Sequence, residues 1–400
     1  MQPARLTLGG IPGAGLAGIP RATVALRPLS EAASAGGLLL LVAPAGAAYR
    51  GGMASTASPV GRSTEPELTS PVDLCTAAGR LNRAAVGFTR RPLHRCNLSG
   101  HWGRKKRWDY WAVTTDACLL SVTYANLDYL GLVVAQFLDF ASGRMQERML
   151  YLPLAPGFAQ PQCVAGSDIV FGGLGLRVAI REQADGTRVQ ASFRTGSGVA
   201  VRADVLVTLP SGHETLGVVI PWNDSLFQYT SKHNTRPAHG SVVVDGRIYR
   251  FDDSTHAYGC LDFGRGIWPY DIVWNWASAS GVQDGHVVGL QLGGKWTDGT
   301  GMNENALCID GRLHKLTDLD FHYDRSDFTA PWRICTRESA RVELTFTPFF
   351  ERAGSVDLGL ACTQIHQLFG RFSGSVRDDD GHRLVIRDLV GWAEEHRARW

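Results

Sequence analysis

Short runs of alternating apolar and polar residues, separated by turn-forming dipeptides, are the feature of this sequence that most restricts its fold. Residues 203–209, ADVLVTL, place Val205, Val207 and Leu209 on one side of an extended chain. Asp-Gly stands between apolar runs at 185–186, 245–246, 310–311 and 380–381. This dipeptide supplies the positive φ angles of tight hairpins, so a hairpin is predicted at each of these places.

From about residue 107 onwards, aromatic and β-branched runs follow one another without helical patterns between them. Many strands joined by hairpins predict an all-β chain of antiparallel barrels or sandwiches. This region is too long for one eight-stranded barrel, so we expect two β domains in tandem, 65–215 and 216–400, with a boundary within 208–225. Only DLVGWAEEHRARW, residues 388–400, has the pattern of a short C-terminal helix, with Asp388 able to cap it.

The first part of the chain differs in composition from the rest. Residues 1–52 contain one acidic residue and consist mainly of Ala, Gly, Pro, Leu and Arg. Without apolar periodicity such a segment cannot offset the entropy of ordering, so residues 1–64 are predicted to be a disordered leader. Two origins are open: an upstream stretch before a true start near Met53, or a targeting leader built around LLLLVA.

The overall composition argues against several classes of protein. A hydrophobic content of 44% and a net charge of +2 are those of a globular chain without a general attraction to nucleic acid, and no run is long enough to cross a bilayer. The eight cysteines stand singly, which favours a reducing, cytoplasmic setting.

Cys75, His94, Cys96 and His101 match no zinc-ligand spacing, so neither a metal nor a cofactor is predicted. The basic run GRKKRW leaves contact with a lipid headgroup open, and the oligomeric state is undetermined.

The stretch GCLDFGRGIWPYDIVWNWASASG, residues 259–281, concentrates three tryptophans beside an aspartate and an arginine. In a strand, Ile272, Trp274 and Trp276 share one face and Val273, Asn275 and Ala277 the other. Asp262, Arg265 and Trp268 precede this strand in a Gly-rich connection. Two interpretations are open. Arg265, held by Asp262 and stacked on an indole, closes the end of a barrel, or Asp262 is a general acid at the mouth of an aromatic cavity that also includes Tyr270.

Two further segments concentrate polar residues. Residues 220–240 contain possible ligand-binding residues and proton donors, or form an interdomain loop whose side chains satisfy turn backbones. The residues concerned are Asn223, Asp224, Lys232, His233, Asn234 and His239. In residues 294–311, Glu304 lies between Asn303 and Asn305, where it is either a second acid or a solvated turn residue.

Five long segments together resemble the bacterial domain-of-unknown-function 2804 family. They are residues 91–113, 231–252, 259–281, 303–316 and 368–395, and the likeness extends over roughly 65–400. More distantly, the Gly-Arg-Gly-x-Trp element followed by an aromatic strand is similar to the lipocalin-pair proteins, which include carotenoid hydratases, tocopherol cyclases and AttH-like proteins. This similarity implies two tandem antiparallel lipocalin-like barrels or sandwiches. The first family implies no activity, and a similarity of fold does not imply one either.

Three hypotheses about function follow. The chain binds a long apolar molecule, a lipid or terpenoid, lined by its aromatic clusters. Alternatively, it is a cofactor-free hydratase (a lyase) or a cyclase (an isomerase) on such a molecule, with Asp262, His233, His239 or Glu304 as the acid. In the third, filled barrels form a structural or interaction module.

Overall fold

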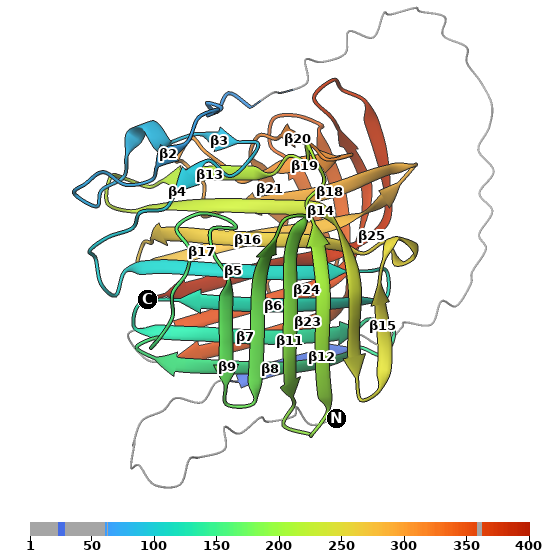
Figure 1. The fold of residues 1–400 in the computed structure, drawn as a ribbon. Helices are drawn as coiled ribbons and strands as arrows, with labels where there is room; N and C mark the ends of the chain where they lie inside the picture. The colour runs from blue at the N-terminus through green and yellow to red at the C-terminus, as the bar shows by residue number, and fades with distance from the viewer. Residues whose placement is uncertain (1–22, 29–60, 62, 358–361) are drawn as a thin grey trace, which may run out of the picture.

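In a computed structural model, the structure describes residues 61, 63–357 and 362–400, together with the backbone of Thr23–Pro28 (Figure 1). The described residues contain almost no helix and consist mainly of antiparallel β-strands, in agreement with the predicted fold class. Most of the expected leader lies outside the described residues. Within it, Thr23–Pro28 forms strand β1, which pairs antiparallel with residues 350–355.

The first of two large sheets has thirteen strands. These are β3 (Phe88–Thr89), β5 (Lys105–Thr114), β6 (Cys118–Asn126), β7 (Leu130–Asp139), β8 (Arg144–Pro153), β9 (Ile169–Gly173), β10 (Leu176–Gln183), β11 (Gly186–Arg194), β12 (Ala200–Thr208), β13 (Leu216–Pro221), β14 (Phe227–Val244), β15 (Arg247–Phe251) and β16 (Tyr258–Ile267). Their main order is β8-β7-β6-β5-β16-β14-β12-β11-β10-β9, with β3, β13 and β15 attached at its side.

The second sheet has ten strands including β1. The others are β17 (Asp271–Gln283), β18 (His286–Gly294), β19 (Ala306–Ile309), β20 (Arg312–Lys315), β21 (Leu319–His322), β22 (Trp332–Thr336), β23 (Val342–Asp357), β24 (Cys362–Arg377) and β25 (Arg383–Arg399). The order is β20-β19-β18-β17-β25-β24-β23-β22-β21. A small parallel pair, β2 (Val72–Asp73) with β4 (His94–Arg95), and two 3-10 turns, Arg83–Ala85 and Asp253–Thr255, complete the described elements.

The four predicted Asp-Gly hairpins are confirmed. They join β10 to β11, β14 to β15, β19 to β20 and β24 to β25. A fifth, Asp284-Gly285, joins β17 to β18. At Asp245-Gly246 and Asp310-Gly311 both residues have positive φ, the geometry that matches the twist of a two-residue hairpin.

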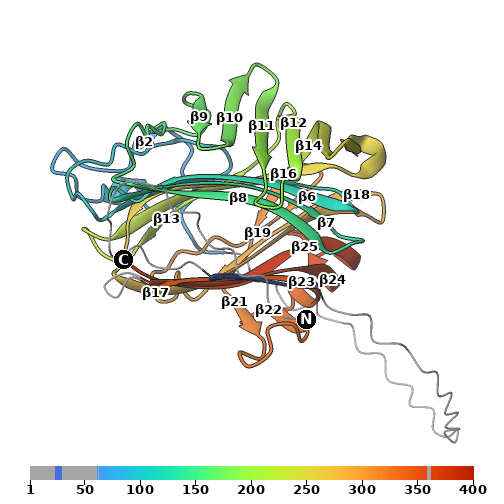
Figure 2. The same ribbon diagram turned by 90° about the horizontal axis from the view of Figure 1, so that it is seen from below.

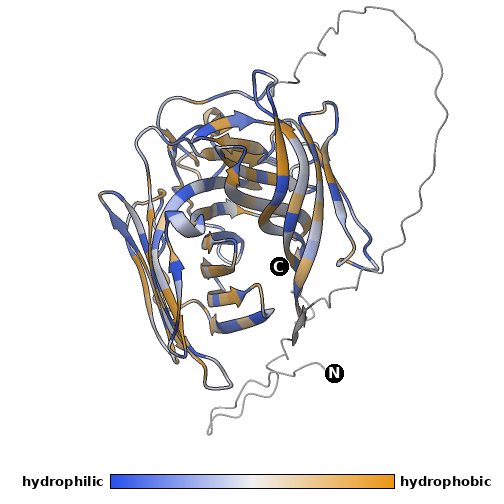
Figure 3. Cartoon of the chain, turned by 90° about the vertical axis from the view of Figure 1, so that its right-hand side faces the viewer, coloured by the Kyte–Doolittle hydropathy of each residue, from blue (hydrophilic) through white to orange (hydrophobic). Residues whose placement is uncertain are grey.

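Each sheet curls over itself into a half-barrel. Figure 2 shows strands β6–β8 of the first sheet lying over β17 and β23–β25 of the second, with β9–β12 above them. Apolar and polar residues alternate along the strands in Figure 3. The interior of the first half-barrel is filled by a buried cluster that includes Trp111, Phe137, Val205 and Phe263, and that of the second by one that includes Leu290, Trp332 and Phe346. Each half-barrel therefore has its own packed core.

The predicted C-terminal helix is wrong. Residues 383–399 form β25, which pairs with β17 on one side and β24 on the other. Trp392 and Glu394 face the first sheet, whereas Ala393 and Leu389 belong to the core of the second half-barrel. Because β25 is buried on both faces between two neighbours, tertiary pairing overrides the helical pattern.

Only a short part of the polar segment 220–240, residues 222–226, is a turn between strands. Its first residues end β13, and its later part is the buried beginning of the long strand β14. The chain passes from the first sheet to the second between Ile267 and Asp271, well after the boundary expected at 215/216. The division into independent domains 65–215 and 216–400 stays a prediction.

Candidate functional site between the two sheets

The two half-barrels present polar side chains to each other. On the first sheet, Lys232, Asp262 and Tyr110 stand opposite one another on β14, β16 and β5. On the second sheet, Trp276, Glu394, Gln367 and Arg352 form the corresponding row across β17, β25, β24 and β23. Directly opposed residues of antiparallel strands share a face, and ring contacts of Tyr110 with Trp276 show that these faces meet. We call this region the inter-sheet layer.

Lys232 is the charged centre of the inter-sheet layer. Its Nζ lies 2.9 Å from Oδ2 of Asp262, 3.1 Å from Oε2 of Glu304 and 4.4 Å from the centre of the Trp276 ring. Burial alone would lower the pKa of Lys232, but the two carboxylates raise it above its ordinary value. Burial raises the pKa of Glu304, and the nearby ammonium opposes this. Lys232 is therefore a permanent cation that holds two carboxyl groups in place.

Glu394 differs from these two carboxyl groups because no cation among the described residues contacts it directly. Its Oε1 accepts a hydrogen bond from Nε1 of Trp274 at 3.2 Å, and its Oε2 accepts one from Nε2 of Gln367 at 3.2 Å. Burial raises the pKa of Glu394 to about 7, partly offset by the Trp274 hydrogen bond and the more distant Lys232. Near neutral pH this carboxyl is therefore present both with and without its proton, as a general acid needs.

Indole rings surround one end of this layer. Trp268 stacks on Trp296 with ring centres 5.4 Å apart and meets further indoles edge-on. Those are Trp108, Trp222, Trp274 and Trp400. Nε1 of Trp296 donates a hydrogen bond to Oε1 of Glu304 at 2.8 Å. These indoles are therefore connected through Glu304 to Lys232. We call these six residues the indole cluster.

The two sheets are not packed tightly against each other beside this cluster. Trp108, Tyr110 and Thr123 lie in the middle of the first sheet on the face towards the second, yet all three are only half-buried. Trp274, His396 and Ile365 are directly opposed neighbours on the second sheet and are also half-buried. Such positions would be fully buried if the facing sheets were packed tightly throughout.

Ion pairs join the two sheets on both sides of this loosely packed region. Lys232 and Glu304 connect β14 to the segment before β19 on one side, where β14 lies against β17 and β18. On the other side, Arg352 of β23 lies 2.8 Å from Oε2 of Glu147 on β8. The inter-sheet layer is thus closed at both ends by charged contacts.

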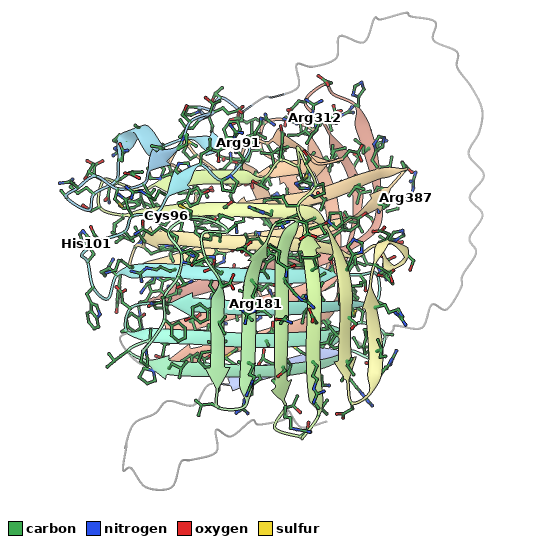
Figure 4. All side chains as sticks on the ribbon, in the orientation of Figure 1. Arg91, Cys96, His101, Arg181, Arg312 and Arg387 are labelled. Carbon is green, nitrogen blue, oxygen red and sulfur yellow. The ribbon has the colours of Figure 1, made fainter. Side chains whose placement is uncertain are left out.

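Two surface hollows lie outside the inter-sheet layer. One, of about 500 Å³, is lined by residues of both sheets, among them His213, Thr235, Tyr258 and Arg312. The other, of about 450 Å³, includes Arg91 and again His213. Arg91 and Arg312 are labelled near the upper edge of Figure 4. Neither hollow is lined by a member of the indole cluster.

The family described as Domain of unknown function (DUF2804) matches residues 65–400. The chain belongs to this family. No curated protein matches the DUF2804 chain in sequence. Several solved structures are distantly similar to it. A putative AttH protein of Nitrosomonas europaea is 14% identical, the match covers 74% of this chain and 92% of that one, and the TM-score is 0.38. Kievitone hydratase of Nectria haematococca is 9% identical, with 73% of this chain and 88% of that one covered and a TM-score of 0.35. CghA with Sch210972 gives 10% identity, 74% and 88% coverage and a TM-score of 0.31. At these TM-scores the similarities support no conclusion about activity.

Half of the residues expected at the site come together in this DUF2804 protein. Six of them lie in or beside the inter-sheet layer: Asp262, Glu304, Lys232, Trp268, Trp274 and Trp276. Glu304, with 1% exposure, is a buried residue rather than a solvated one. The predicted shared face of Trp274 and Trp276 is confirmed by their contacts with His396 and Trp392.

The other expected residues lie elsewhere. His233 is buried beside Arg236, and burial and this arginine lower its pKa well below the usual value. His239 is exposed, and its Nε2 is 3.9 Å from Asp253. Asn223 caps a surface turn, Asp224 pairs with Arg83, and Tyr270 is 44% exposed.

The expected pair of Asp262 with Arg265 is wrong. Residues 258–267 form strand β16 rather than a connection, so residues three apart along it face opposite ways. Asp262 therefore points to Lys232 in the inter-sheet layer. Arg265 points into the first half-barrel, where its Nη2 is 2.9 Å from Oδ2 of Asp109. The arginine inside the barrel and the candidate acid Asp262 therefore lie on opposite faces of β16.

Sequence reasoning missed Glu394, Gln367, Arg352 and Tyr110. Glu394 was missed because the C-terminal segment was predicted to be a helix. The alternation of Trp392, Glu394 and His396 could have indicated a strand instead. As for metals, the described part of the chain brings together one possible ligand group, Asp378, Asp380 and His382 in the exposed β24–β25 hairpin. Cys96 is buried and His101 is exposed, and they are labelled apart in Figure 4. No helix in the described ranges is long and apolar enough to cross a membrane.

Proposed function

We propose that the inter-sheet layer binds an apolar small molecule that carries at least one polar group. The observation that supports this most directly is the half-buried state of Trp108, Tyr110 and Trp274 in the middle of facing sheets. Aromatic walls with a few convergent polar groups are typical of small-molecule sites. Both half-barrel interiors are occupied by their own side chains, so the ligand lies between the half-barrels rather than inside one.

The charged centre sets the polarity of such a ligand. Lys232 is already matched by Asp262 and Glu304, so a strongly charged ligand would meet no free counter-ion there. The Trp274 indole and the Glu394 carboxyl instead offer a ring face and a hydrogen-bonding group side by side. A largely apolar skeleton with a hydroxyl or carbonyl oxygen fits both.

Tryptophan fluorescence tests this proposal because indoles line the layer. We expect 1-dodecanol to quench the emission of the full chain in a saturable way. Trp274→Leu should weaken this binding by about tenfold, since a large apolar contact is lost. Trp102→Leu is the matched control, because Trp102 is 70% exposed. Unsaturable quenching, or equal binding by both variants, would contradict the proposal.

A second function, acid catalysis on the bound molecule, is favoured by Glu394. Asp262 is bound to the Lys232 ammonium, whereas Glu394 has a raised pKa and lies against the Trp274 ring system. A protonated carboxyl could protonate a carbon–carbon double bond, and the indole faces could stabilise the cation until water adds to it and returns a proton to the Glu394 carboxylate. This assigns the acid role to Glu394 instead of Asp262, His233, His239 or Glu304.

Citronellol, which has a trisubstituted double bond, is a suitable probe of this second function. In heavy-oxygen water, we expect the chain to incorporate the label into a tertiary alcohol. Glu394→Gln should abolish the incorporation, whereas Glu395→Gln should retain it because Glu395 faces Lys295 and Tyr323 on the opposite side of β25. Equal activity of Glu394→Gln and the unaltered chain would exclude Glu394 as the acid.

A further inference from the structure

One lysine of this chain stands apart from the others. The chain has five lysines, and four of them contact a carboxylate. These are Lys105 with Asp128 at 3.2 Å, Lys232 with Asp262 at 2.9 Å, Lys295 with Glu395 at 2.6 Å and Lys315 with Glu65 at 2.8 Å. Lys106 has no carboxylate at ion-pair distance among the described residues. Its Nζ instead lies 4.6 Å from the ring centre of Tyr129 and 4.9 Å from that of Trp400.

The position of Lys106 connects it to the inter-sheet layer. On β5 it precedes Trp108 by two residues and Tyr110 by four, so all three side chains share the face towards the second sheet. Trp400, which covers the amine, belongs to the indole cluster. A molecule lying along Trp108 and Trp400 would therefore reach the amine of Lys106.

The surroundings of Lys106 weaken its hold on a proton. Lys106 is 1% exposed, and among the described residues its Nζ donates one hydrogen bond, to the carbonyl of Gly103 at 3.4 Å. Burial lowers the pKa of Lys106 to about 7; Asp128 opposes this, and Arg104 and Arg107 add to it. Asp128 is itself bound by Arg107 at 3.0 Å as well as by Lys105. A desolvated lysine of this kind is an activated nucleophile.

We propose that Lys106 forms a Schiff base with an aldehyde or ketone group of an apolar ligand held in the inter-sheet layer. The nitrogen lone pair attacks the carbonyl carbon, a proton passes from nitrogen to oxygen, and water leaves as the carbon–nitrogen double bond forms. No oxidant or reductant is needed. This rests on the proposed binding function and makes it specific, because it names carbonyl compounds as the ligand class.

Dodecanal and 1-dodecanol form a matched pair of probes, since only the aldehyde can react with an amine. The full chain is incubated with dodecanal and sodium cyanoborohydride, and the modified peptides are mapped by mass spectrometry. We expect one dodecyl group, on Lys106, with labelling that rises through about pH 7 and then levels off. An ordinary lysine would continue to gain reactivity up to a pH near 10. Lys106→Arg keeps the cation between the rings and should lose the label, whereas Lys295→Arg should keep it.

The outcomes separate this inference from the function on which it rests. If 1-dodecanol quenches the indoles but dodecanal labels Lys106 no faster than Lys295, the Schiff base is refuted and the binding site stands. If neither probe affects the indoles, the binding proposal fails. Melting curves of Lys106→Arg and the unaltered chain should coincide. If Lys106→Arg loses both the label and the fold, Lys106→Met replaces it as the test. Methionine cannot form an imine but fills the same space between the rings.

Discussion

Arg265 on β16 and Asp109 on β5 form a buried ion pair inside the first half-barrel, with Nη2 of the arginine 3.1 and 2.9 Å from the two carboxylate oxygens. The guanidinium also donates to the carbonyls of Trp108 and Pro161. Burial raises the pKa of Asp109, and Arg265 counteracts this. The arginine that the sequence connected with a candidate acid is thus fully occupied in holding the barrel together.

Loss of this partner should destabilise the fold. Asp109→Asn leaves the Arg265 charge buried without a counter-charge, which costs roughly 3–5 kcal/mol. Urea unfolding measures this loss. Asp204→Asn is the control: it removes an ion pair with Arg188 whose side chains are 45% and 44% exposed, so we expect a change of about 1 kcal/mol or less. Similar effects of both substitutions would show that burial of the Asp109 pair has no special importance.

The raised pKa of Glu394 predicts a pH-dependent contribution to stability. Because the folded chain binds this proton more tightly than the unfolded chain, the contribution is complete below the unfolded pKa of 4.5 and is lost as the pH rises through about 7. The unaltered chain should therefore lose up to about 3 kcal/mol relative to Glu394→Gln between those limits. Unfolding free energies of both chains near pH 5 and near pH 8 test this. A difference that does not vary with pH would place the pKa of Glu394 in its ordinary range.

The contact of Glu147 with Arg352 should couple the two sheets. Both side chains are largely buried, at 15% and 8% exposure, and they belong to β8 and β23. A double-mutant cycle with Glu147→Gln and Arg352→Met should give a coupling energy on the order of 1–3 kcal/mol. The double variant should also bind 1-dodecanol faster, because this contact closes one side of the inter-sheet layer. An additive cycle would mean that the sheets are held together elsewhere.

Gly264 tests how closely the wall of the layer is packed. A Cβ at this position would lie 2.1 Å from the Trp108 ring, so Gly264→Ala must displace that indole. We expect a loss of roughly 1–3 kcal/mol in unfolding free energy and weaker quenching by 1-dodecanol. Gly172→Ala has open space around it and should change neither property. Unchanged binding by Gly264→Ala would place the ligand away from Trp108.

Local pattern determined much of the architecture. The Asp-Gly turns, the alternation of Val205, Val207 and Leu209, and the shared face of Trp274 and Trp276 all depend on residues within a few positions of one another. Such features follow from strand geometry and turn chemistry, which neighbouring residues dictate. They were sufficient to predict an all-β chain with two curled sheets. They were insufficient at β25, where burial on both faces places Glu394 and Glu395 among apolar residues and obscures the period of two.

The charged partners were decided by tertiary structure alone. Lys232 meets Asp262 because β14 and β16 pair in one register, and Arg265 meets Asp109 because β16 and β5 pair in another. A shift of one residue would turn each of these side chains to the opposite face. The meeting of Lys232 with Glu304 and of Glu147 with Arg352 depends further on how one half-barrel lies on the other. An ion pair forms only where the charged atoms come within about 4 Å of each other, so the choice of partners is determined by strand pairing between distant segments rather than by any local run of residues.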